Sequence, residues 1–85
     1  MRILYMPKAV RDLERFPLYI QKRITDKIDF YAAQSDPLTF AERLTGVGAY
    51  RFRIGNYRVT VEIGNNAMFI MLIKKRDEST YKGLS

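Results

Sequence analysis

The chain has 85 residues, contains neither cysteine nor histidine, and carries a net charge of +6. This composition excludes disulfides, thiolate and imidazole catalysis, and the usual zinc and haem ligand sets, so we expect no metal and no cofactor. Any chemistry must use arginine, lysine, tyrosine, hydroxyl or carboxylate side chains. At this length, with 47% hydrophobic residues, the sequence predicts one small domain over residues 1–85, with a modest core.

Positive charge is concentrated in the second half of the chain. Residues 1–42 carry seven basic and six acidic side chains, a net of +1, whereas residues 43–85 carry eight basic and three acidic ones, a net of +5. This asymmetry indicates a polyanionic partner, either nucleic acid or an acidic protein segment. The longest apolar run, residues 67–73, is too short to cross a membrane, and the amino terminus lacks a signal-peptide core. We therefore expect a soluble, cytoplasmic protein.

The first half of the chain predicts a short strand over residues 2–6 and then two helices. Pro7 suits the first position of a helix, because its missing N–H would have no partner there. Pro17 ends this segment and opens the second helix, which stops at Ser35-Asp36-Pro37. The apolar stripes expected to face the core are Ala9, Val10, Leu13 and Phe16 on the first helix and Ile20, Ile24, Ile28 and Tyr31 on the second.

The second half predicts a sheet. Residues 38–44 are expected to add a turn or two of helix, and three strands then follow over residues 47–54, 57–63 and 67–74. The last of these is apolar on both faces, which predicts a central strand. The order β-α-α-β-β-β predicts an α+β fold, with a two-helix hairpin packed on one face of a small, mainly antiparallel four-stranded sheet.

The segment 50–59, YRFRIGNYRV, is the most informative part of the chain. Its period of two places Arg51, Arg53 and Arg58 on one face of a hairpin. If Gly55-Asn56 is a two-residue turn, Arg53 lies opposite Arg58, although like charges across a ladder destabilise it by roughly 0.2–1 kcal/mol. No acidic residue lies between Ala49 and Val61. The segment therefore predicts an anion-binding face, whereas a single arginine would indicate only a solvated strand.

A second basic cluster, Lys74-Lys75-Arg76, ends the last strand. A two-residue turn at Asn65-Asn66 would place Lys75 on the arginine face, whereas a three-residue turn would place Lys74 and Arg76 there. The alternative is that this cluster only terminates a sheet edge. Tyr81 follows in a polar segment, where its phenol is expected to stack on a base or exchange a proton unless it folds back onto the core.

Taken together, these features resemble the RelE/ParE superfamily of toxins from toxin–antitoxin pairs, with the RelE branch favoured. The resemblance covers nearly the whole chain. It comprises the early strand and two-helix hairpin, Leu44-Thr45-Gly46 before the arginine hairpin, the segment 50–59, and Lys75-Arg76 followed by Tyr81.

The RelE-branch resemblance implies a ribosome-dependent mRNA endonuclease. In that branch the 2′-hydroxyl attacks the adjacent phosphate and leaves a cyclic phosphate and a free 5′-hydroxyl. The residues that the resemblance assigns to catalysis are Arg53, Arg58, Arg76 and Tyr81, and those assigned to RNA binding are Arg51, Lys74 and Lys75. Because arginine stays protonated and cannot act as a conventional general base, the candidate proton carriers are Tyr81, Glu62 and Lys75.

Two other functions fit the same resemblance: a ParE-like toxin that inhibits DNA gyrase without nuclease activity, and a degenerate member that only binds its antitoxin. In each case the resemblance implies a cognate antitoxin, often acidic where it wraps the toxin. For the nuclease it also implies the ribosome and mRNA as partners. Operator DNA would be contacted only through the antitoxin, and no membrane is involved.

Overall fold

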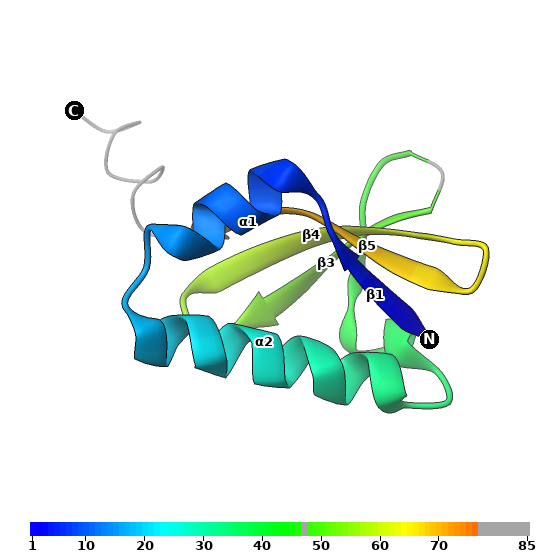
Figure 1. Ribbon diagram of the computed structural model, residues 1–85. Coiled ribbons are helices and arrows are strands. Elements are labelled where there is room, and N and C mark those ends of the chain that lie inside the picture. Colours follow the sequence, from blue (N-terminus) through cyan, green and yellow to red (C-terminus); the bar gives the residue numbers. More distant parts are fainter. Residues whose placement is uncertain (47, 77–85) are drawn as a thin grey trace.

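The computed structural model describes residues 1–46 and 48–76. In chain order the elements are β1 (Arg2–Tyr5), α1 (Pro7–Glu14), α2 (Leu18–Ala33), the 3₁₀ turn η1 (Pro37–Phe40), β2 (Glu42–Arg43), β3 (Ala49–Ile54), β4 (Tyr57–Gly64) and β5 (Ala67–Lys75). The strands form one sheet in the order β1-β5-β4-β3-β2 (Figure 1). β1 runs parallel to β5, and the other three pairs are antiparallel.

This architecture confirms the α+β class and the predicted order of elements. The expected four-stranded sheet is wrong, because Glu42 and Arg43 pair with Arg51 and Tyr50 as a fifth strand. The helix expected over residues 38–44 is limited to the single turn η1. A strand of two residues cannot show a period of two, so the sequence carried no signal for β2. The expected interior position of the last strand is confirmed, since β5 lies between β1 and β4.

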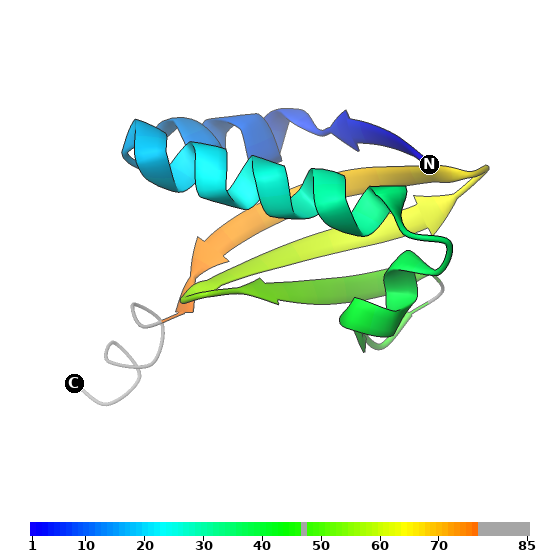
Figure 2. The same cartoon turned by 90° about the horizontal axis from the view of Figure 1, so that it is seen from below.

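Both helices cover one face of the sheet, and the other face is open (Figure 2). The alternation of β3 and β4 places their apolar residues under the helices, as the period of two requires. The residues that make up the core include Ile20, Ile24, Ile28 and Tyr31 from α2, and Phe52, Ile54, Val59, Val61, Met68, Ile70 and Ile73 from the sheet. None of the helices in the described residues is long and apolar enough to cross a membrane.

On α1 the predicted stripe is wrong at one position. Val10 is 40% exposed, and Asp12 is buried instead at 4% exposure. β1 pairs with β5 only as far as Tyr5, opposite Ile70, so the N–H of Ile73 has no strand partner on that side. Asp12 Oδ2 accepts this N–H at 2.9 Å, and the Lys8 ammonium bonds its other oxygen. α1 thus completes the sheet edge with a carboxylate where β1 has ended.

Two turns and one bulge set the register of β3, β4 and β5. Gly55 has a φ of 59°, and a side chain there would also meet the Arg23 guanidinium at 3.1 Å. Asn65 and Asn66, with φ of 52° and 57°, form the two-residue turn between β4 and β5. A shift in pairing between Thr60 and Val61 then leaves Met71 without a partner in β4.

This bulge decides which lysine reaches the arginine face. With a two-residue turn at Asn65-Asn66, the sequence predicts Lys75 there, and that prediction is wrong. The extra residue, Met71, reverses the parity of the rest of β5, so Lys74 lies opposite Arg58 and Lys75 lies opposite Tyr57. The structure therefore places Lys74 on the arginine face, as expected for a three-residue turn, although the turn has two residues and the bulge causes the shift.

Candidate anion-binding site

The arginine face is built by cross-strand rows on the open side of the sheet. The predicted register of β3 and β4 is confirmed, with Arg53 opposite Arg58. Lys74 extends this row on β5, so that three cations lie in line across three strands. Arg51 lies one row further along β3, opposite Thr60. Three like charges in one row do not stabilise a sheet, and their convergence therefore indicates an anionic ligand.

Part of this face is hollowed into a cleft of about 320 Å³, here called the anion cleft. Its described lining consists of Arg51, Arg58, Thr60, Leu72, Lys74, Lys75 and Arg76. Five of these seven residues are basic and none is acidic, so the cleft is suited to a phosphate-sized anion. It brings together five of the predicted site residues. Arg53 is not part of this lining.

Two hydrogen-bond donors of residues that line the anion cleft are buried without an acceptor in the described part of the chain. The Nε atoms of Arg51 and Arg58 are shielded from solvent, and no described residue accepts a hydrogen bond from either. A buried donor left unpaired costs about 1–3 kcal/mol, and more when the group is charged. An oxyanion bound in the cleft would offer these donors the acceptors they lack.

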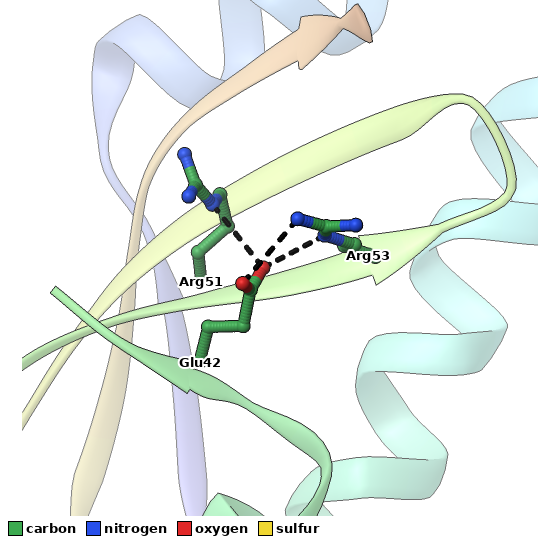
Figure 3. A network of polar contacts seen from close by, with 3 residues as sticks. All are labelled: Glu42, Arg51 and Arg53. Atoms are coloured by element: carbon green, nitrogen blue, oxygen red, sulfur yellow. Dashed lines mark hydrogen bonds and ion pairs between the residues drawn. The ribbon is translucent and has the colours of Figure 1, made fainter.

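Arg53 has a different partner, which the sequence did not reveal. Glu42 on β2 accepts hydrogen bonds from Arg53 Nε at 2.7 Å and from Arg53 Nη2 at 3.3 Å (Figure 3). The same carboxylate lies 3.7 Å from Arg51 Nε, an ion pair without a hydrogen bond. Glu42 is therefore an acid on the arginine face in addition to Glu62, the carboxylate that the sequence offered as a proton carrier. Only the pairing of β2 with β3 brings Glu42 there, and no pattern in the sequence indicated that pairing.

The electrostatics of Glu42 follow from these neighbours. The hydrogen bond from Arg53 lowers the pKa of the Glu42 carboxyl below its usual value of 4.5, and the positive charges of Arg53, Arg51 and Arg58 act in the same direction. Glu42 is therefore ionised at neutral pH. It neutralises Arg53 and lies close to Arg51 without accepting a hydrogen bond from it.

The end of β5 joins the site through its backbone. The Arg76 N–H donates to the Asn56 carbonyl at 2.6 Å, which ties the residue after β5 to the β3–β4 turn and places Arg76 in the lining of the anion cleft. Glu62 lies on the same face of β4, two residues beyond Thr60. Tyr81, predicted to be catalytic, lies outside the described residues.

Comparison with known protein families gives one match over most of the chain. A sequence model described as the ParE toxin of type II toxin–antitoxin system, parDE, matches residues 3–80. No curated protein sequence matches the chain.

Solved toxin–antitoxin complexes share the fold. The archaeal RelE–RelB complex from Pyrococcus horikoshii OT3 contains a chain 25% identical to this one, with a TM-score of 0.74 over 91% of this chain and 96% of that chain. The RelBE2 complex from Mycobacterium tuberculosis is 22% identical, with a TM-score of 0.74 over 91% and 92% of the two chains. The chromosomal ParDE system from Pseudomonas aeruginosa is 14% identical, with a TM-score of 0.71 over 88% and 95%. At 22% and 14% identity, these last two show a common fold alone.

Proposed function

Because the chain belongs to the ParE toxin family, within the RelE/ParE superfamily, and is therefore the toxin of a toxin–antitoxin pair, we propose that it cleaves messenger RNA on the ribosome. The observation that carries this proposal is the pair of buried guanidinium Nε donors of Arg51 and Arg58, which have no hydrogen-bond acceptor among the described residues, in a cleft lined otherwise mainly by cations. Such donors match the non-bridging oxygens of a phosphodiester, which gain negative charge during phosphoryl transfer.

The proposed reaction is attack of the 2′-oxygen on the adjacent phosphorus. The O2′–P bond forms, the P–O5′ bond breaks, and the products carry a 2′,3′-cyclic phosphate and a 5′-hydroxyl. Arg58 and Arg76 hold the non-bridging oxygens of the scissile phosphate, and Arg51, which lines the same cleft, binds a phosphate oxygen of the strand and orients it. Lys74 and Lys75 bind the flanking RNA, and Tyr81 donates the proton that the leaving 5′-oxygen requires.

Glu42 supplies the proton acceptor that the arginines cannot. It is ionised at neutral pH, it lies against Arg51, and each of its oxygens keeps a free lone pair despite the bonds from Arg53. We assign to it the proton of the 2′-hydroxyl. General-base catalysis contributes typically about 10²–10⁴-fold, so Glu42→Gln is expected to lower kcat by at least about 10²-fold. Glu62→Gln on the same face is the matched control and should retain wild-type turnover.

The partners follow from the family and from the charge of the surface. Solved relatives are toxin–antitoxin complexes, and a cognate antitoxin is the partner of this chain as well. We propose that an acidic segment of the antitoxin covers the arginine face, and that the ribosome and mRNA bind when it is absent. Operator DNA is then contacted through the antitoxin, and the toxin acts in the cytoplasm, where its substrate is.

The deciding experiment is in vitro translation of a defined messenger with the purified toxin. Cleavage within codons, with a cyclic phosphate on one product, is the expected result. Lys22→Ala, which removes an exposed lysine paired only with Asp26 on α2, should leave cleavage unchanged. Arg58→Ala should slow it by about 10²–10³-fold. Intact messenger together with normal translation would contradict the nuclease.

A second candidate is supported by the family match, because the matching sequence model is that of ParE. In the ParE branch the toxin would inhibit DNA gyrase by binding it. A supercoiling assay with purified gyrase separates the two functions: loss of supercoiling with no RNA cleavage would replace the nuclease by this alternative.

A further inference from the structure

A second cleft, of about 570 Å³, lies on the other side of the β5 end, between the α1–α2 turn and the sheet. It is here called the hairpin cleft. Lys74 and Lys75 line both this cleft and the anion cleft, so the two clefts adjoin at the end of β5. None of the residues with a proposed catalytic role is part of its described lining.

The walls of the hairpin cleft combine positive charge with exposed aromatic surface. Four cations and one carboxylate line it, a net of +3, and the carboxylate, Asp12, is already bonded by the Ile73 N–H and by Lys8. Tyr19 is 74% exposed at the rim, and Tyr57 lies deeper, edge-on to Phe16 at 5.0 Å. The exposed ring of Tyr19 is therefore open to a base that stacks on it.

We propose that the hairpin cleft binds the nucleotides that flank the scissile phosphate in single-stranded RNA. The strand runs from the anion cleft over Lys74 and Lys75, a base stacks on Tyr19, and Arg15 binds a flanking phosphate. Aromatic rings beside a basic track are the usual means of holding a single strand without reading its sequence. The inference rests on the proposed function, since it extends the same bound strand.

A strand fits this surface better than an acidic peptide does. Arg58 lines the anion cleft, Arg15 lines the hairpin cleft, and Lys74 and Lys75 line both, a series of cations that suits the phosphates repeated along one backbone. An acidic segment would use the charges and leave the open face of Tyr19 without a ligand. The volume is within the usual range of ligand pockets, roughly 300–1,000 Å³.

The test is binding of fluorescently labelled RNA to the free toxin, measured by anisotropy. The probes are a dinucleotide and a hexanucleotide, both 2′-O-methylated so that they cannot be cleaved. Tyr19→Ala should weaken hexanucleotide binding on the order of 10-fold and leave dinucleotide binding unchanged. Arg15→Ala should reduce the slope of log K against log salt by about one for the hexanucleotide. Leu18→Ala, 80% exposed in the same turn but outside the cleft lining, is the matched control.

The outcomes separate this inference from the proposed function. Unchanged hexanucleotide binding by both Tyr19→Ala and Arg15→Ala overturns the inference. So does a loss confined to antitoxin affinity, measured by calorimetry, because the cleft would then be an antitoxin site. If Tyr19→Ala weakens hexanucleotide binding as expected while the wild type cleaves no messenger, the RNA-binding role of the hairpin cleft is supported and the proposed nuclease activity is contradicted.

Discussion

Strands β3, β4 and β5 contribute to both faces of the sheet, and the two faces have opposite properties. On the covered face Phe52, Val59 and Val61 are fully buried beneath the helices. On the open face the alternating neighbours Arg53 and Arg58 lie opposite each other. Apolar burial stabilises the fold on one side, and on the other side a row of like charges is retained at some cost in stability. The residues that stabilise the fold and the residues that we propose to bind the ligand are thus neighbours in the sequence. Single substitutions can therefore change the stability or the binding without changing the other.

The largest effect is expected from a substitution on the covered face. Phe52 is fully buried and stacks on Tyr31 with ring centroids 4.5 Å apart, so Phe52→Ala should lower the free energy of unfolding by about 3–5 kcal/mol. Urea denaturation followed by circular dichroism measures this. A loss below about 1 kcal/mol would show that the covered face does not carry the fold.

On the open face, Arg58→Ala should lower the cleavage rate and leave the free energy of unfolding nearly unchanged. Loss of one donor to the reacting phosphate is expected to lower the cleavage rate by about 10²–10³-fold. The free energy of unfolding should change by less than about 1 kcal/mol, towards greater stability, because Arg53 loses a like charge across the ladder. Single-turnover cleavage and urea denaturation of the same preparation test both parts. A destabilised variant with normal cleavage would reverse the assignment of the two faces.

The next prediction concerns Asp12, the charged residue that accepts a backbone hydrogen bond at the edge of the sheet. Asp12→Ala leaves the buried Ile73 N–H unpaired and should cost about 1–3 kcal/mol. Burial would raise the pKa of Asp12, but the Ile73 N–H and the Lys8 ammonium hold it below its ordinary value of 3.8. Since the folded pKa is the lower one, the wild-type advantage is full above about pH 4 and is lost as the pH falls through the folded pKa. Denaturation curves from acidic to neutral pH measure this loss, and a pH-independent difference would contradict it.

The smallest effect is expected from a buried polar group, the hydroxyl of Tyr5. The Tyr5 hydroxyl is buried with no hydrogen-bond partner among residues 1–46 and 48–76, and burial, with a smaller contribution from Asp29, raises its pKa to about 12. Tyr5→Phe should therefore raise the free energy of unfolding by about 1 kcal/mol. Because the unfolded phenol ionises first, the wild type should lose stability between about pH 10 and 12 and the variant should not. Thermal melts at pH 8 and 11 compare the two, and equal melting temperatures at both would show that the hydroxyl has a partner.

Periodicity in the sequence was sufficient to predict most of the fold. The helical spacing of Ile20, Ile24 and Ile28 and the alternation around Gly55 are local patterns, so the α2 core stripe and the Arg53–Arg58 register were predicted and are confirmed. Strand bounds agreed within two residues. The RelE/ParE resemblance, too, depended on these local segments.

What the sequence could not predict depends on pairing between distant residues. Glu42 reaches the arginines only because a two-residue strand pairs with β3. The parity of Lys74 depends on a bulge at Met71, in a run that is apolar throughout and therefore carries no alternation to mark it. From the sequence alone, Asp12 would be taken for a solvated charge on a helix. Its buried position follows from the early end of β1, which leaves the Ile73 N–H to donate to the Asp12 carboxylate.

The parallel pairing of β1 with β5 joins the first strand of the chain to the last. During synthesis β1 therefore has no partner until residues 67–75 have been made, and the contact closes a loop of about sixty residues at an entropic cost. The same late strand brings Lys74 and Lys75, and Arg76 after it, so the anion cleft is assembled only after residue 76 has been made. A nascent chain in which β5 has not yet been synthesised therefore lacks the anion cleft.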